Sequence, residues 1–181
     1  MAKRILAIET TNHKSSINKQ LVDFATSLLD GSESDRIDMI PYDMVLFSSD
    51  KHRDDGVPGQ AVKFREMLGV YDGCIISLAE HNGSYTAVFK NLMDWVSVLE
   101  GKVWQQKPVL LLSTSPGKRG GATVLGVAEN YFPHMGAQVT GGFSLPFFHD
   151  AFEEGQGIID QKKLAELTEK VAEFEAAVLS F

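Results

Sequence analysis

The chain has 181 residues, the length of a single domain that can bury a sizeable hydrophobic core. A formal charge of −7 and the lack of any basic run argue against a general nucleic-acid binder. The single cysteine, Cys74, excludes an internal disulfide and disfavours a Cys-based zinc site. No apolar run is long enough for a membrane helix, and the run at residues 5–8 is too short for a signal peptide. We therefore expect a cytoplasmic protein that binds neither nucleic acid nor membrane.

Short apolar runs alternate along the chain with longer segments of helical spacing. The predicted strands cover residues 3–8, 35–42, 73–78, 108–114 and 137–143. The predicted helices cover residues 16–29, 57–71, 88–99, 121–134 and 160–178. Strands that alternate with helices of this length are typical of βαβ units, in which a parallel sheet is covered on both faces. The sequence therefore predicts one α/β domain over residues 1–181, a three-layer doubly wound fold with a five-stranded parallel sheet.

In such a fold, ligands bind at the carboxyl ends of the strands, so the loops that follow the strands are the candidate sites. The first of these loops, residues 9–18, contains no glycine and lacks both the dinucleotide and the Walker phosphate-binding fingerprints. Its hydroxyl groups and Asn18 lie at a predicted helix N-terminus, which favours a phosphate, and either His13 or Lys14 would add charge. Alternatively, Ser15 or Ser16 only caps the helix.

The loops after the third and fourth predicted strands are rich in turn residues. In residues 79–86, an Asn-Gly pair makes a tight turn and Ser84 is the expected cap of the next helix, whose Phe89 and Trp95 we expect in the core. The loop at residues 113–121 has three glycines and a proline, which permit a flat ligand to approach the backbone. Proline and glycine are also ordinary loop residues, so this pattern alone is weakly specific.

Taken together, three segments resemble the NADPH-dependent FMN reductase family of flavodoxin-like proteins. They are TTNHKSSIN at residues 10–18, AEHNGSYTAVFKNLMDW at 79–95 and KPVLLLSTSPGKRGG at 107–121. The family shows the patterns GSxRxxSxN, PEYNGSxPGxLKNxIDW and KPxxxxSxSPGxxGG in the same order. The middle segment is the most specific, because NGS, KN and DW keep both identity and spacing. The resemblance spans nearly the whole chain and implies a flavodoxin-like fold that binds FMN and reduces it with NADPH or NADH.

The resemblance also implies, position by position, which residues bind the cofactor. Around the FMN phosphate it places Thr11, His13, Ser16, Ile17 and Asn18. Along the ribityl chain and the isoalloxazine ring it places Ala79, Glu80, His81, Asn82 and Gly83. At the ring edge it places backbone groups of Ser115, Pro116 and Gly117, with Gly120 as a further candidate.

Several residues depart from the family pattern close to this site. Thr10 stands where the family has glycine, and Glu9 precedes it where a small residue is usual. His13 replaces an arginine and cannot form a bidentate pair with a phosphate. Ala79 and His81 replace the proline and the tyrosine of the middle pattern. Because a carboxylate repels a phosphate, we expect Glu9 either to point away from the site or to weaken FMN binding.

The implied reaction is a ping-pong transfer of a hydride from the nicotinamide to FMN and of electrons on to a quinone, a free flavin, an azo compound or a metal ion. We expect no side-chain nucleophile and no metal site, and His81 is the candidate proton donor near the ring. Two alternatives stay open: a flavodoxin-like electron carrier, and a non-enzymatic scaffold that has lost tight FMN binding. Since the family commonly forms dimers or tetramers, we expect a homodimer or a homotetramer.

Three further features lie outside these motifs. Residues 43–55 are rich in charge and are expected to form a mobile, solvated loop, and a position at the border of the active site stays open for them. Residues 143–152 are unusually aromatic for a loop, and both core packing and subunit contact stay open for them. Cys74 lies in an apolar run and is expected to be buried and unreactive.

Overall fold

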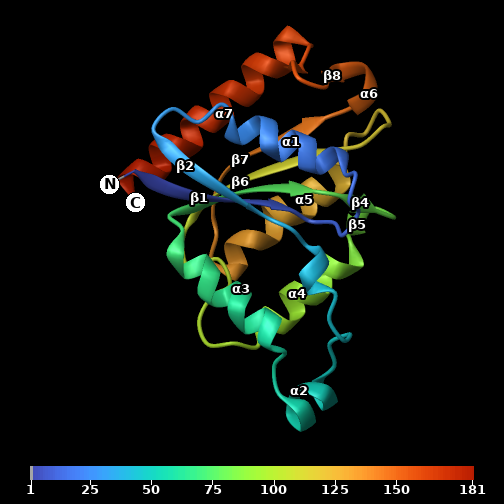
Figure 1. Cartoon of the computed structure of the whole chain (residues 1–181), viewed down its shortest axis with the longest axis vertical. Helices are drawn as coiled ribbons and strands as arrows, with labels where there is room; N and C mark the ends of the chain where they lie inside the picture. The colour runs from blue at the N-terminus through green and yellow to red at the C-terminus, as the bar shows by residue number, and fades with distance from the viewer. Residues whose placement is uncertain (1) are drawn as a thin grey trace.

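Five strands form one parallel sheet in the computed structural model, which describes residues 2–181 (Figure 1). They are β1 (Lys3–Glu9), β2 (Ser32–Ile37), β3 (Gly73–Leu78), β6 (Pro108–Thr114) and β7 (Gln138–Leu145). Their order in the sheet is β2-β1-β3-β6-β7, so the direction of winding reverses at β1, between β2 and β3. This is the strand order of flavodoxin-type proteins. The predicted fold class is confirmed.

Helices cover both faces of the sheet (Figure 1). The helices α1 (Ile17–Thr26) and α7 (Gln161–Ser180) lie on one face. The other face carries α3 (Gly59–Val70), α4 (Ala87–Ser97) and α5 (Ala122–Tyr131). Short apolar strands need this cover on both sides, because their side chains alternate between the two faces.

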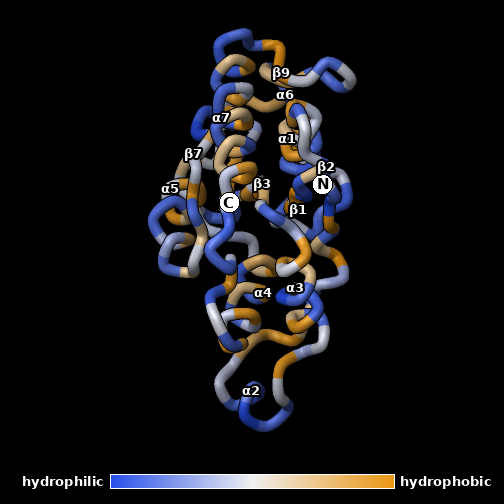
Figure 2. Tube along the Cα trace, turned by 90° about the vertical axis from the view of Figure 1, so that its left-hand side faces the viewer, coloured by the Kyte–Doolittle hydropathy of each residue, from blue (hydrophilic) through white to orange (hydrophobic). Residues whose placement is uncertain are grey.

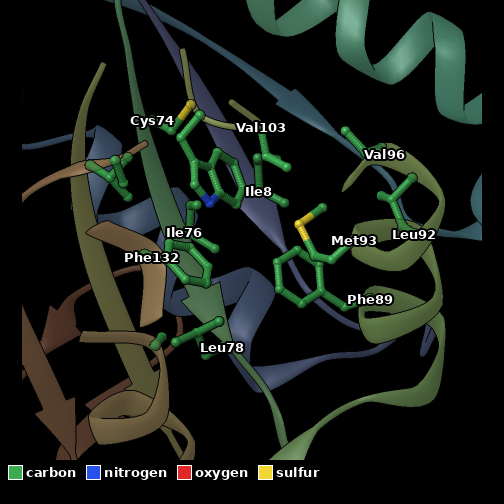
Figure 3. Close-up of a cluster of buried hydrophobic side chains, with 14 of the residues drawn as sticks. Ile8, Cys74, Ile76, Leu78, Phe89, Leu92, Met93, Val96, Val103 and Phe132 are labelled. Atoms are coloured by element: carbon green, nitrogen blue, oxygen red, sulfur yellow. The ribbon is translucent and has the colours of Figure 1, made fainter. Parts of the chain in front are cut away.

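The sheet therefore separates two hydrophobic cores. Ile5 and Ala7 of β1 pack on the side of α1 and α7, whereas Leu6 and Ile8 pack on the side of α3, α4 and α5. Figure 3 shows part of the second core, in which side chains from β1, β3 and α4 lie together with Val103 and Phe132.

Short elements connect these layers. They are η1 (Ile40–Tyr42), α2 (Ser49–Asp55), β4 (Glu80–His81), β5 (Ser84–Tyr85), η2 (Phe132–Met135), α6 (Phe148–Ala151), β8 (Phe152–Glu153) and β9 (Gly157–Ile158). The pair β4 and β5 forms one small antiparallel hairpin, and β8 and β9 form another.

The second strand is shifted from its predicted place. The sequence predicts it at residues 35–42, but β2 spans Ser32–Ile37. It is an edge strand whose central residues are exposed, so it lacks the apolar pattern by which a strand is found. The apolar residues that favoured a later strand include Met39, which is buried, and the 3₁₀ turn η1 that follows it.

The sequence predicts a loop over residues 43–55, but the second half of this charged segment forms the helix α2. Ser48 caps this helix by accepting a hydrogen bond from the amide of Lys51 at 3.2 Å. None of its residues is buried. The helix projects from the rest of the chain beyond α3 and α4, as Figures 1 and 2 both show.

Buried residues elsewhere follow the sequence expectations. Phe89 and Trp95 are 0% and 1% exposed, and Cys74 is buried in β3, where burial raises the pKa of its thiol to about 12. In the aromatic segment, Phe148 is buried and stacks on Phe152 with ring centroids 4.8 Å apart. Core packing therefore accounts for part of that segment.

Within residues 2–181, no helix is long and apolar enough to cross a membrane. The same residues contain no group of three or more His, Cys, Asp or Glu side chains that is arranged to hold a metal ion.

Candidate functional site

A cleft of about 270 Å³ lies at the carboxyl ends of β1, β3 and β6, where the winding of the sheet reverses. It is lined by the three loops that follow these strands: Thr11, His13, Ser15, Ser16, Ile17, Asn18, Ala79, Glu80, His81, Thr114, Ser115 and Pro116. The predicted cofactor-binding residues are thus brought together, except for Asn82, Gly83, Gly117 and Gly120. Ser15 and Thr114 line the cleft in addition.

Thr10 is a structural residue at the start of the first loop, directly after β1. Its amide donates to the carbonyl of Ser77 at 3.1 Å, and its hydroxyl oxygen accepts from the amide of Ala79 at 3.0 Å. Its carbonyl accepts a hydrogen bond from the hydroxyl of Thr86. The side chain that replaces the family glycine is therefore fully buried and joins the first loop to the second.

The start of α1 is fixed by two polar side chains. The hydroxyl oxygen of Ser16 accepts from the amides of Asn18 and Lys19 at 3.1 and 3.4 Å, so Ser16 is the helix cap. The side-chain oxygen of Asn18 accepts from the hydroxyl of Ser77 at 2.9 Å. These bonds hold the helix N-terminus, with its positive dipole end, at the wall of the cleft.

The second loop is a two-residue hairpin. Asn82 and Gly83 have φ of 53° and 75°, as a type I′ turn between short antiparallel strands requires. The turn places these two residues at the tip, outside the cleft, and leaves His81 on its wall. Ser84 pairs with His81 in the hairpin, so the predicted cap is wrong. Thr86 is the cap of α4, and its hydroxyl oxygen accepts from the amide of Phe89 at 3.3 Å.

The carboxylate of Glu80 is turned toward the start of α5. Its Oε2 accepts a hydrogen bond from the amide of Val124, in the first turn of α5, at 2.9 Å. A carboxylate at a helix N-terminus is stabilised by the helix dipole. Glu80 thereby links the hairpin to α5 at the edge of the cleft.

Two of the three glycines in the third loop have different roles. Gly120 has φ of 57°, and a Cβ there would lie 2.4 Å from the hydroxyl oxygen of Ser144. Its carbonyl accepts from the hydroxyls of Ser113 and Ser144 at 2.8 and 3.0 Å, so Gly120 shapes the loop from behind. A Cβ on Gly117 would meet no atom within 4 Å. Packing within the protein therefore does not require glycine at Gly117.

Glu9 does not line the cleft. It is 3% exposed, lies under α1 and forms an ion pair with Arg36 at 3.4 Å. Arg36 also pairs with Asp23 of α1 at 3.1 Å. Burial raises the pKa of Glu9 to about 7, and Arg36 opposes that rise. The carboxylate thus points away from the cleft, which is the first of the two outcomes expected for it.

A second cleft of about 220 Å³ adjoins the first across His81, which lines both. Its other walls come from the first loop, from the segment after β2 and from the start of α4: Asn12, Tyr42, Asp43, Met44, Leu46, Thr86, Ala87, Val88 and Asn91. A separate cavity of about 530 Å³ lies between α4 and the α5–η2 segment. None of the predicted cofactor-binding residues lines that larger cavity, and the chemistry of the three loops favours the paired clefts.

The sheet order and the loop-lined cleft at its switch point define a flavodoxin-type cofactor-binding protein. The NADPH-dependent FMN reductase family matches residues 3–150 of the chain. The chain therefore belongs to this family of FMN- and NADPH-dependent oxidoreductases, and the expected family and cofactors are confirmed.

Relatives of known sequence and structure agree with this assignment. The NADH:(hydroxy)cinnamate reductase subunit CrdA of Vibrio ruber is 28% identical over 173 residues, which cover 93% of this chain and 84% of that one. The 2-hydroxy-1,4-benzoquinone reductase of a Burkholderia species is 34% identical over 124 residues, with 67% and 66% covered. The flavoenzyme FerB of Paracoccus denitrificans has the same fold, with a TM-score of 0.78, 22% identity and 99% and 98% of the chains covered.

Proposed function

We propose that this enzyme binds FMN in the first cleft and uses NADPH or NADH to reduce a quinone by a ping-pong mechanism. FMN, when bound, supplies the redox chemistry by accepting a hydride from the nicotinamide and returning the electron pair to the acceptor. In the net reaction, NAD(P)H, one proton and a quinone give NAD(P)⁺ and a hydroquinone. The observation that carries the proposal is that residues from three family motifs, distant in sequence, line one cleft at the switch point of the sheet.

The residues of the cleft fit an FMN phosphate at the start of α1. Ser16 orients the first turn of the helix, and Thr11, His13 and Ser15 add polar groups to the same wall. The carboxylate of Glu9, which would repel a phosphate here, forms an ion pair with Arg36 instead. We assign the phosphate to this wall.

The opposite wall fits the flat ring. Ala79, Ser115 and Pro116 present backbone and small side chains to the cleft, and the space beside Gly117 is open. Amides of the third loop would stabilise negative charge on the reduced ring. In this proposal Asn82, Gly83 and Gly120 support the loops and do not touch the cofactor.

His81 is the proposed proton donor to the acceptor. It lies on the wall shared by the two clefts, so its imidazole can serve a molecule in either. Glu80 also lines the first cleft, and its carboxylate accepts a hydrogen bond from the amide of Val124.

Purified protein tests the proposal directly. Titration of the flavin-free chain with FMN, followed by quenching of flavin fluorescence, is expected to give a saturating curve with one FMN per chain. NADPH absorbance at 340 nm is then expected to fall when a quinone is added. FMN binding without NADPH oxidation would identify an electron carrier instead, and no FMN binding would contradict the proposal.

We further propose a homodimer or homotetramer. Val127 and Tyr131 of α5 are 40% and 57% exposed, and tyrosine is among the residue types that are enriched in subunit contacts. Light scattering after size-exclusion chromatography would give the mass in solution, and a monomer would contradict this part of the proposal.

A further inference from the structure

The segment at residues 43–47 forms the outer wall of the second cleft, and two residues of α4 hold it there. Asn91 and Trp95 are four positions apart, so they project from the same side of the helix. The side-chain oxygen of Asn91 accepts from the amide of Phe47 at 2.8 Å, and its nitrogen donates to the carbonyls of Met44 and Val45, each at 3.2 Å.

Trp95 completes this attachment. Its indole Nε1 donates to the carbonyl of Val45 at 2.8 Å, and its ring meets that of Phe47 edge-on, with centroids 4.9 Å apart. Asn91 and Trp95 are 6% and 1% exposed, so the bonds are made in a buried environment. The buried polar groups would be costly to leave unpaired.

Met44 and Phe47 of the held segment pack against the core, whereas the residues between them are exposed. Val45 and Leu46 are 51% and 71% exposed, and the helix α2 that follows has no buried residue. All the hydrogen bonds from α4 go to backbone groups of the segment. The position of the wall is therefore set by α4, while the exposed side chain of Leu46 lines the cleft and is free to contact a ligand.

The chemistry of the second cleft favours an uncharged molecule. Met44, Leu46, Ala87 and Val88 make its lining largely apolar, and no lysine or arginine is among the lining residues that the structure describes. The acidic Asp43 would repel a phosphate. The volume of about 220 Å³ is below the range of about 300–1,000 Å³ typical of drug-sized ligands, which suits a molecule of one or two rings.

We propose that Asn91 and Trp95 are positioning residues for the acceptor site, and that Leu46, on the wall they hold, selects a flat, uncharged, apolar acceptor. The second cleft would receive this acceptor beside the flavin, on the far side of His81. This inference rests on the proposed function, because it needs FMN in the first cleft.

The test compares two tryptophan variants. Trp95→Phe removes the indole donor to Val45 and keeps an aromatic ring, whereas Trp104→Phe is the matched control. Trp104 is 1% exposed and its Nε1 has no hydrogen-bond partner within residues 2–181. The acceptors are 2-methyl-1,4-naphthoquinone and ferricyanide, a small anion that takes electrons without needing an apolar wall.

For Trp95→Phe we expect the KM for the quinone to rise by about tenfold, while kcat changes by less than about twofold. The rate with ferricyanide is expected to stay at the level of Trp104→Phe. Leu46→Ser, an exposed change, is expected to raise the quinone KM similarly. An unchanged quinone KM in both Trp95→Phe and Leu46→Ser, or an equal loss with ferricyanide, would overturn the inference.

Hydrogen exchange provides a readout that does not depend on activity. The amide of Phe47 is expected to exchange at least about tenfold faster in Asn91→Ala than in the wild type or Trp104→Phe, because its acceptor is lost. Unchanged exchange would overturn the positioning role. If the wild type oxidises NADPH with neither acceptor, the proposed function fails; if it does so only with ferricyanide, the proposed acceptor class fails and FMN reduction stands.

Discussion

The side-chain oxygen of Asn18, in the first turn of α1, accepts a hydrogen bond of 2.9 Å from the hydroxyl of Ser77 near the end of β3. Asn18 and Ser77 are 4% and 0% exposed. The bond crosses the switch point of the sheet, so it sets the start of α1 against the neighbouring strand. Asn18 thus has a structural role inside the protein, whereas the family resemblance places it at the FMN phosphate.

Ser77→Ala tests that role. We expect the free energy of unfolding to fall by about 1–3 kcal/mol, because the variant leaves the oxygen of Asn18 buried and unpaired. Urea denaturation followed by circular dichroism measures the change. Ser180→Ala, at the exposed end of α7, is the control and is expected to change stability by less than about 0.5 kcal/mol. Equal stability of the two variants would show that the Asn18–Ser77 bond contributes little.

Glu9 predicts a particular dependence of stability on pH. Its pKa is about 7 in the folded chain, against about 4.3 for an unperturbed glutamate, so between these values the folded chain holds a proton that the unfolded chain has released. The stability that this proton confers is fully present below about pH 4.3 and is lost as the pH rises through 7.

Glu9→Gln, which mimics the neutral form, should remove this loss. Relative to the wild type, we expect the variant to gain on the order of 1–3 kcal/mol in unfolding free energy between pH 5 and pH 8. Urea titrations at several pH values across this range measure the difference. Glu33→Gln, on the exposed edge strand β2, is the control. Parallel curves for wild type and Glu9→Gln would contradict the prediction.

Substitutions at two glycines of the third loop are expected to affect folding and ligand binding separately. Gly120→Ala forces a side chain into φ of 57° and against Ser144, so we expect a loss of at least about 1–3 kcal/mol in stability. Gly117→Ala meets no atom within 4 Å and is expected to fold with normal stability, yet to weaken FMN binding about tenfold by occupying the space proposed for the ring. Thermal melts and FMN titrations of the two proteins give both results. Wild-type FMN affinity in Gly117→Ala would place the ring elsewhere.

His81→Ala tests proton transfer. General acid catalysis by a positioned side chain contributes about 10²–10⁴-fold, so we expect kcat for the quinone to fall by at least about a hundredfold at pH 7. Added imidazole is expected to restore part of the rate. Steady-state turnover with saturating quinone is the measurement, and wild-type turnover in His81→Ala would exclude His81 as the donor.

The parts of the fold that could be predicted from sequence are those with a strong apolar signal. The strands β1, β3 and β6 are continuous apolar runs because they are buried on both faces. The edge strand β2 has the polar sequence SESDRI, and α2 has no buried residue, so neither leaves a periodic pattern. Burial, and not the presence of structure, decides which elements a sequence reveals.

The same limit applies to the site. The three loops could be placed together because parallel strands end at one edge of the sheet. Thr86 and not Ser84 caps α4, because Ser84 pairs with His81 in the hairpin. The bond from Asn91 to Phe47 joins residues 44 positions apart, and no local pattern indicates such a contact.

The helix α2 offers a place where the chain can be altered. Its seven residues belong to neither core, and it projects beyond α3 and α4 (Figure 1). Exposed segments of this kind accept insertions and proteolytic nicks. A reporter peptide inserted after Lys51 should leave both cores intact, and a fluorophore there would report on the wall of the second cleft from only a few residues away.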